Sequence, residues 1–213
     1  MNYSISKLTL SFLALFFLSF FSNAQTELTS TEIENFQQQV FAKAEEVENL
    51  QGTFIQTKHE EFLASPAESS GKFYYNTNNQ LNWTYIEPFE MGILFTDGKL
   101  FLTENGKTRE IDVSAYKMFD QLSELISKSI NGKIIQQQDF EISYTKAGDF
   151  TKTILKPISQ QQQLFSQIEL YFNSDYLVEQ IKLIEGEESY VLIRLNDLKV
   201  NQPIAESVFE VEK

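Results

Sequence analysis

The single histidine of the chain, His59, is the first side chain to consider for acid, base or nucleophilic chemistry. A Ser-His-Asp site requires an imidazole that an acid orients beside a nucleophile. No serine of this sequence lies in a Gly-x-Ser-x-Gly elbow. A zinc site built without cysteine needs more than one histidine. We therefore expect His59 to be a surface residue of a strand or loop, with no catalytic role.

Carboxylates are the other reactive groups, and composition alone leaves a paired-acid glycosidase open. The Asp and Glu residues mostly alternate with apolar residues or occupy turns, as solvated faces do. The sequence contains no D-x-[DN]-x-[DN]-G calcium loop and no Gly-rich phosphate loop. These observations favour binding over turnover, so we expect no enzyme activity, no catalytic residue, no cofactor and no metal. An enzyme acting on lipid or glycan would gain support if His59 were buried beside a carboxylate.

Residues 1–24 have the pattern of a cleaved secretion signal. Lys7 supplies the positive charge, Leu8–Phe21 is nearly all apolar, and Ser22–Ala24 is a small-x-small cleavage site. Cleavage after Ala24 removes 24 of the 213 residues and leaves 189, a length typical of one domain, 25–213. Because the chain has no cysteine, we expect no disulfide and no lipid anchor on the exported protein.

The net charge is −13, and it becomes −14 when Lys7 is removed with the signal. This balance disfavours nucleic acid and anionic lipid surfaces as partners, because both attract patches of Lys and Arg. An acidic surface suits a basic docking partner, although its usual role is solubility. We expect a monomer that binds no nucleic acid.

An amphipathic helix is predicted at the start of the mature chain. Thr29 or Thr31 can cap it, and Glu32 or Glu34 completes a capping box. Its apolar residues recur at spacings of three and four, which makes one stripe. The stripe consists of Ile33, Phe36, Val40, Ala44 and Val47.

Alternating strands joined by tight turns follow this helix. Asp97-Gly98 and Asn105-Gly106 are strong type I′ hairpin signals. They separate predicted strands at Met91–Thr96, Lys99–Glu104 and Lys107–Val113. Later turns at 147–149, 173–175 and 185–188 separate further alternating runs. In one of these runs Ile168, Leu170 and Phe172 share a face. In the next run the residues that share a face are Leu177, Glu179, Ile181 and Leu183. The pattern predicts an antiparallel sheet of about eight to eleven strands, large enough to curl.

Large apolar side chains are concentrated in residues 71–98. Phe73 and Tyr75 point to one face of a strand, and Trp83 lies with Leu81 and Tyr85 on one face of the next. Helices, a partner or an apolar ligand must cover such a face. A second helix, Ser114–Ile130, is predicted by the spacing of Phe119, Leu122, Ile126 and Ile130, with Met118 and Leu125 flanking and Asn131-Gly132 ending it. This helix should cross one face of the sheet.

The order of these elements and several local motifs resemble the LolA-like family of periplasmic outer-membrane lipoprotein carriers. The matching motifs are Thr53–Lys58 (a Phe-x-Gln strand), Gly71-Lys72-Phe73, the aromatic strand Leu81–Pro88, the Asp-Gly-Lys turn in Ile93–Lys99, and the ending Pro203–Val211. The resemblance implies a mainly β (α+β) fold: a strongly curved antiparallel sheet that forms an open half-barrel covered by amphipathic helices. It also implies a carrier in the periplasm that shuttles lipoproteins from the inner to the outer membrane by binding their acyl chains in an apolar cavity.

The partners implied by the resemblance are acylated lipoproteins or lipids, an inner-membrane release complex and an outer-membrane acceptor. One departure concerns the Arg-Pro pair by which familiar family members hold their lid closed. Thr77-Asn78 stands at this place in the present chain, so the lid latch must be built differently or be weaker.

We expect the acyl-chain cavity wall to consist of Phe73, Tyr75, Leu81, Trp83, Tyr85, Ile93 and Phe95. The lid is expected to consist of Phe36, Val40, Val47, Phe119, Leu122, Leu125 and Ile126. Permanent core is the alternative role for each wall residue. Two alternatives keep the fold and change the function: a periplasmic shuttle for another acylated or polyene-type lipid, and a lipoprotein-sensing module that signals through a protein partner.

Overall fold

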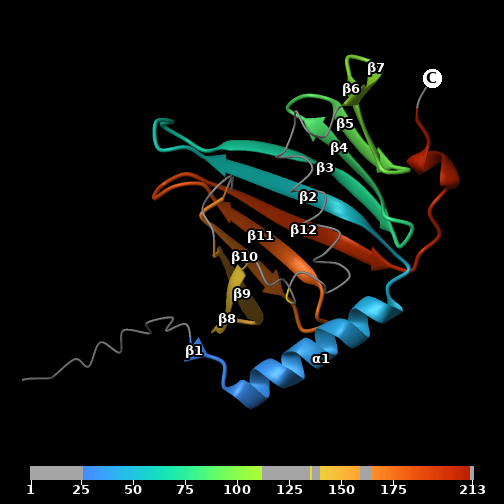
Figure 1. The fold of residues 1–213 in the computed structure, drawn as a ribbon. Helices are drawn as coiled ribbons and strands as arrows, with labels where there is room; N and C mark the ends of the chain where they lie inside the picture. Colours follow the sequence, from blue (N-terminus) through green and yellow to red (C-terminus); the bar gives the residue numbers. More distant parts are fainter. Residues whose placement is uncertain (1–25, 112–134, 136–139, 159–164, 212–213) are drawn as a thin grey trace, which may run out of the picture.

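The chain forms one strongly curved antiparallel sheet with a helix packed at one end (Figure 1). The structure, a computed structural model, describes residues 26–111, 135, 140–158 and 165–211. The elements are β1 (Thr26–Glu27), α1 (Ser30–Glu46), β2 (Asn49–His59), β3 (Ala67–Asn76), β4 (Gln80–Glu87), β5 (Met91–Thr96), β6 (Lys99–Glu104), β7 (Lys107–Ile111), β8 (Phe140–Ala147), β9 (Phe150–Pro157), β10 (Gln167–Phe172), β11 (Val178–Ile184), β12 (Tyr190–Val200) and the 3₁₀ helix η3 (Glu206–Phe209).

The strand order is β1-β8-β9-β10-β11-β12-β2-β3-β4-β5-β6-β7. Neighbours in this order are antiparallel throughout, and β12 pairs with β2 to join a half made of β8–β12 to a half made of β2–β7. The end strands β1 and β7 do not pair with each other, so the sheet is an open half-barrel, as predicted. It has 12 strands, more than expected, partly because the two-residue β1 adds to the edge of β8.

The predicted hairpin turns are confirmed by their backbone angles. Asp97 and Gly98 have φ values of 54° and 72°, and Asn105 and Gly106 have 51° and 68°. Positive φ at both central residues is the type I′ geometry, whose twist matches that of the flanking strands. β7 is described as far as Ile111.

The predicted placement of Glu179 on the same face as Ile181 is wrong. Phe172 pairs with Val178, whereas the preceding Tyr171 pairs with Gln180. This irregularity inserts one extra residue into β11, so Glu179 leaves the apolar row and accepts a hydrogen bond from Asn173 Nδ2 at 2.6 Å. Val178 occupies the buried position instead. Alternation read from the sequence cannot reveal such a bulge, because both flanking runs keep a period of two.

Helix α1 begins with the predicted capping box, formed by Thr29 and Glu32. The Glu32 carboxylate accepts hydrogen bonds from the Thr29 backbone N–H at 2.9 Å and from its hydroxyl at 2.7 Å. These bonds to the charged form lower the pKa of Glu32.

The C-terminal end of α1 is tied to the sheet by Asn201, which follows β12. Its Oδ1 accepts hydrogen bonds from the backbone N–H of Glu48 at 2.8 Å and of Asn49 at 3.3 Å. Its Nδ2 donates to the carbonyl oxygen of Glu46, the last residue of α1, at 2.7 Å. The residue has φ of 55°, a conformation that asparagine tolerates better than most residues. Asn201 therefore fixes the position of the junction between α1 and β2 relative to the end of β12.

Replacing Asn201 with Ala is expected to lower the free energy of unfolding by about 2 kcal/mol, because it removes three hydrogen bonds and strains a positive φ. Urea-induced unfolding of the mature chain would measure the loss. Asn201→Gly separates the two causes, since glycine relieves the backbone strain but not the missing bonds. Stability of Asn201→Ala equal to that of the native chain would show that these bonds carry no net energy.

Several sequence-based predictions lie outside the described residues. They are the secretion signal 1–24 and the second helix Ser114–Ile130, with its lid residues Phe119, Leu122, Leu125 and Ile126. Within the described ranges, no helix is both long enough and apolar enough to cross a membrane.

Candidate functional site

All seven predicted wall residues lie on one face of the sheet. Across β3, β4 and β5, Phe73 pairs with Trp83, and Trp83 with Ile93. In the same way Tyr75 pairs with Leu81, and Leu81 with Phe95, while Tyr85 lies two residues after Trp83 on the same strand. Side chains at directly paired positions point to the same side of a sheet. We call this side, which also carries Leu102 and Ile111, the inner face.

The wall is packed tightly around Trp83. Its ring stacks on Phe54 with centroids 4.0 Å apart and on Phe73 at 5.6 Å. Phe54 also meets Tyr85 edge to face at 5.1 Å. All the predicted wall residues are buried except Phe95, which is half-buried. Phe54, on β2, packs against the predicted wall but is not among the residues predicted for it from the sequence, although its Phe-x-Gln strand is one of the motifs.

Gly71 makes this aromatic packing possible. A Cβ added at Gly71 would lie 1.9 Å from the Thr84 carbonyl oxygen and 2.7 Å from two ring atoms of Phe54. Contacts below 3.0 Å are essentially never made by real Cβ atoms, so the Phe54 ring occupies the space that a side chain at position 71 would need. Position 71 of the Gly-x-Phe motif therefore has to be glycine, because the Phe54 ring and the Thr84 carbonyl oxygen lie too close to leave room for a side chain.

Polar groups on the wall are few and buried. The Tyr85 hydroxyl donates a hydrogen bond to Gln56 Oε1 at 3.0 Å, and burial raises the pKa of Tyr85. The indole Nε1 of Trp83 is buried and has no hydrogen-bond partner within the described part of the chain. No charged side chain belongs to the predicted wall. Such a surface suits apolar ligands, because desolvating it costs little.

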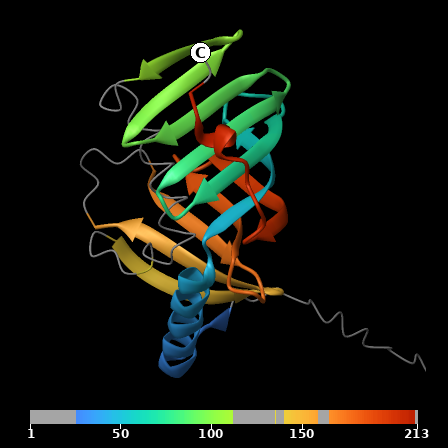
Figure 2. The ribbon, with the colours of Figure 1, turned by 90° about the vertical axis from the view of Figure 1, so that its right-hand side faces the viewer.

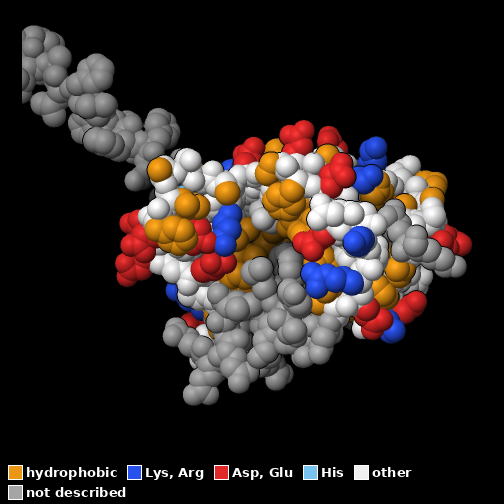
Figure 3. Space-filling view, turned by 90° about the horizontal axis from the view of Figure 1, so that it is seen from above, with side chains coloured by type: hydrophobic (Ala, Val, Ile, Leu, Met, Phe, Trp, Pro, Cys, Tyr) orange, Lys and Arg blue, Asp and Glu red, His pale blue; other side chains and the backbone are white. Residues whose placement is uncertain are grey.

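The apolar inner face continues into the other half of the sheet. Ile193 and Leu195 of β12 pair with Gln56 and Phe54 of β2, which makes the surface continuous across the junction. The buried aliphatic and aromatic residues on this second half include Leu155, Ile168, Leu170, Phe172, Ile181, Leu183, Ile193 and Leu195, and the buried Thr151 and Thr153 of β9 pair with Phe172 and Leu170 among them. The sequence analysis recognised part of this alternation but did not assign it to the site, since the β2–β12 pairing cannot be read from local patterns. In the space-filling view, hydrophobic side chains gather in a recess near the centre (Figure 3).

The three described lid residues lie on and just after α1, which packs at one end of this second half. Phe36 meets Phe172 edge to face with centroids 5.2 Å apart, and it lies 5.8 Å from Tyr144. Gln37 Nε2 donates to the Tyr144 hydroxyl at 2.9 Å, and burial raises the pKa of that tyrosine. Val40 is buried with Phe36, and Val47 is buried just after the helix. The Phe36 ring thus contacts rings on β8, on β10 and in the turn after β10. It makes no ring contact with the predicted wall residues on β3–β5 among the described residues.

His59 lies away from the wall. It pairs with Tyr190 at the end of β2, and its ring stacks on that of Tyr190 with centroids 5.2 Å apart. Its neighbour Lys58 pairs with Val191 and shares the inner face, so His59 points to the outer face. No group of three or more His, Asp or Glu residues in the described ranges is arranged to hold a metal ion.

Thr77-Asn78, at the place of the family's Arg-Pro pair, lies in the β3–β4 turn. The Thr77 N–H donates to the Glu48 carbonyl oxygen at 3.0 Å, close to the end of α1. Among the described residues, no hydrogen bond connects Thr77 or Asn78 to the inner face of β3 or β4. This position is therefore part of the connection between helix and sheet.

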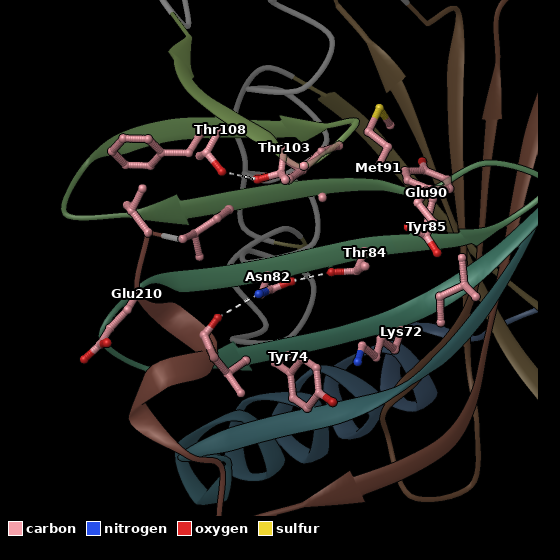
Figure 4. Close-up of a pocket in the computed structure, with 18 of the residues that line it drawn as sticks. Lys72, Tyr74, Asn82, Thr84, Tyr85, Glu90, Met91, Thr103, Thr108 and Glu210 are labelled. Atoms are coloured by element: carbon pink, nitrogen blue, oxygen red, sulfur yellow. Dashed lines mark hydrogen bonds between the residues drawn. The ribbon is translucent and has the colours of Figure 1, made fainter. Parts of the chain in front are cut away.

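An open groove of about 810 Å³ lies on the outer face of β3–β6, beside the C-terminal segment (Figure 4). In this segment η3 packs across β4 (Figure 2). Asn82 Nδ2 donates to the Val208 carbonyl oxygen at 2.7 Å (Figure 4). Thr84 donates to Asn82, and Thr103 and Thr108 hydroxyls lie 2.9 Å apart. Hydroxyl and amide groups line much of this groove, so it suits an acyl chain less well than the inner face does.

Comparison with known proteins finds a curated relative and similar solved structures. A curated relative, the outer-membrane lipoprotein carrier protein of Alkalilimnicola ehrlichii, is 24% identical over 170 residues, which cover 79% of this chain and 75% of the relative. A LolA superfamily protein from Nitrosomonas europaea superposes with a TM-score of 0.42 at 13% identity, covering 82% of this chain and 97% of the other. The Mycobacterium tuberculosis lipoprotein LppX superposes with a TM-score of 0.46 at 10% identity, covering 83% and 99%.

The match to a family model covers most of the chain. Residues 45–212 match the model described as outer membrane lipoprotein carrier protein LolA. The matched range begins at the end of α1 and includes strands β2 to β12, so it contains every predicted wall residue. The description of this family names a carrier of lipoproteins. The chain therefore belongs to the LolA family of outer membrane lipoprotein carrier proteins.

Proposed function

We propose that the protein is a periplasmic carrier that binds the acyl chains of lipoproteins against its inner face and shuttles them from the inner to the outer membrane. The observation that carries the proposal is the continuous apolar inner face, lined by stacked aromatic rings and spanning both halves of an unclosed sheet. Membership of a lipoprotein carrier family supports the same cargo.

The energetics of such a carrier follow from the wall. Each buried methylene contributes about 0.8 kcal/mol, so one long acyl chain gains several kcal/mol on leaving water. Segments that cover the wall in the empty state must be displaced by cargo, which reduces the net affinity by the free energy of closure. A carrier that has to release its cargo at an acceptor benefits from this reduction.

Part of the predicted lid is helix α1. We propose that α1 holds one end of the inner face closed through Phe36 and through the hydrogen bond from Gln37 to Tyr144. This contact would do part of the work for which familiar family members use an arginine. The other predicted lid residues keep the role assigned to them from the sequence.

Mass spectrometry of ligand retained by the protein after purification from the periplasm tests the cargo. Acylated N-terminal peptides of lipoproteins are the expected result. A free lipid of another class, such as a polyene, would contradict the lipoprotein cargo and support a shuttle for that lipid.

Trp83 fluorescence tests the wall itself, because Trp83 is the only tryptophan of the chain. Adding a triacylated lipopeptide is expected to shift its emission wavelength with a saturable dose dependence, since the acyl chain changes the packing around a buried ring. The same peptide without acyl chains is the control and should cause no shift. An unchanged spectrum at saturating lipopeptide would exclude Trp83 from the wall.

A further inference from the structure

Exposed hydrophobic side chains are concentrated at the end of the half-barrel that lies away from α1. Phe62 is 81% exposed and Leu63 42% exposed in the β2–β3 loop, and Ile86 and Phe89 are about half exposed around the β4–β5 loop. We call these four residues the tip surface. Exposed aromatic and aliphatic groups that gather in one place mark interaction sites more often than scattered ones do.

Register places these loops at the same end of the sheet. Lys58 of β2 pairs with Ala67 of β3, and Ser70 of β3 pairs with Glu87 of β4, so the loops after β2 and β4 leave the sheet in the same direction. The β11–β12 loop joins them, because Ser189 Oγ accepts a hydrogen bond from the Glu61 N–H at 3.4 Å. The tips of the β2–β3 and β11–β12 hairpins lie together at the left of Figure 1, far from the C-terminal end of α1.

The loops around the tip surface are strongly acidic. Residues 60–68, 87–90 and 185–188 contain eight Glu residues and no Lys or Arg. The nearby Lys58 forms an ion pair with Glu60, and this contact raises the pKa of Lys58. Lys58 is therefore already paired, and the charged side chains of the tip loops themselves are all negative.

The tip surface is connected to the wall. The Phe89 ring stacks on that of Tyr85 with centroids 5.7 Å apart, and Tyr85 in turn meets Phe54. A protein docked on the tip surface would therefore contact a side chain that packs directly on the proposed acyl-chain site.

We infer that the tip surface docks on a protein partner that presents an apolar surface bordered by Lys and Arg. Phe62 and Leu63 are the anchors, because protruding aromatic and aliphatic side chains bury apolar area against such a surface. The surrounding carboxylates select a basic rim and steer the approach. They disfavour direct insertion into a bilayer, since membrane-binding loops use basic residues to attract anionic lipid. This inference rests on the proposed carrier function, because a carrier must dock where its cargo is released or accepted.

An amphipathic helical peptide composed of Lys, Leu and Ala serves as the probe, and its counterpart with Glu in place of Lys is the matched control. The mature protein is expected to bind the Lys peptide and not the Glu peptide in fluorescence anisotropy. Binding should weaken at least tenfold in Phe62→Ser/Leu63→Ser, and also in Glu187→Lys/Glu188→Lys. Glu34→Lys/Glu45→Lys makes the same charge change on exposed positions of α1 and should leave the affinity within about twofold.

Equal loss of binding in the α1 and β11–β12 charge variants would overturn the inference, because the net charge of the protein, and not the position of the carboxylates, would then explain the loss of affinity. Retained binding in Phe62→Ser/Leu63→Ser would overturn it as well. Cosedimentation with phosphatidylethanolamine–phosphatidylglycerol vesicles that depends on Phe62 and Leu63 would replace the protein partner with a membrane. The acyl-chain site is tested separately: the tip variants should still respond to lipopeptide through Trp83, so failure of docking is distinguishable from failure of the carrier function.

Discussion

Gly71→Ala is expected to destabilise the fold by about 3 kcal/mol, a large effect for one methyl group. The added Cβ would lie 1.9 Å from the Thr84 carbonyl oxygen, a backbone atom of the paired strand, and 2.7 Å from the Phe54 ring. Neither neighbour can move freely, because Thr84 belongs to the β3–β4 ladder and Phe54 is stacked on Trp83. The strands must separate or the aromatic stack must shift, and either change loses packing energy.

Urea-induced unfolding, followed by Trp83 emission, measures this loss. Gly92→Ala is the matched control, because a Cβ at that position would meet its nearest atom, Thr103 Cβ, at an ordinary 3.5 Å. We expect Gly92→Ala to change the free energy of unfolding by less than about 1 kcal/mol. If both substitutions had the same effect, the close approach of Phe54 to Gly71 would not constrain the fold.

Phe95→Asp is expected to weaken binding of an acylated lipopeptide at least tenfold, which corresponds to about 1.4 kcal/mol or more. Phe95 lies on the inner face between Leu81 and Leu100 and is half-buried. A carboxylate there must either lose water when an acyl chain covers it or keep water at the wall, and both outcomes oppose an apolar ligand.

Phe101→Asp is the control for this substitution. Phe101 is also half-buried, but it pairs with Leu94 on the opposite face of the sheet, in the outer groove. Both variants add the same charge to neighbouring strands, so a general loss of stability should affect both. Lipopeptide titration by isothermal calorimetry, with circular dichroism to confirm folding, compares them. Equal weakening by both variants would move the acyl-chain site away from the inner face.

The sequence predicted the local features of this fold well, because they depend on short-range rules. The Asp97-Gly98 turn needs only its own backbone preference, and the Thr29 capping box needs only residues three positions apart. The alternation around Trp83 placed the predicted wall on one face for the same reason. The strand number predicted that the sheet would curl, and the resemblance to the family added the open half-barrel and the hypothesis of a lipoprotein carrier.

Features that depend on long-range pairing could not be predicted. Phe54 joins the wall only because β2 pairs with β3, and the second half of the inner face joins it only because β12 pairs with β2. The bulge that removes Glu179 from its row depends on how β11 meets β10. The ring contacts of Phe36 with Tyr144 and Phe172 likewise depend on where α1 lies after folding, since its apolar stripe fits many surfaces.

The pairing of β2 with β12 also has a consequence for how the protein is made. Residues 49–59 pair with residues 190–200, which follow much later in the sequence, so the two halves join only after both strands have been synthesised. Contacts so distant in sequence form slowly, because a long loop must close before they contribute energy. The junction between the two halves, and with it the continuity of the inner face, therefore forms only after residues 190–200 have been synthesised.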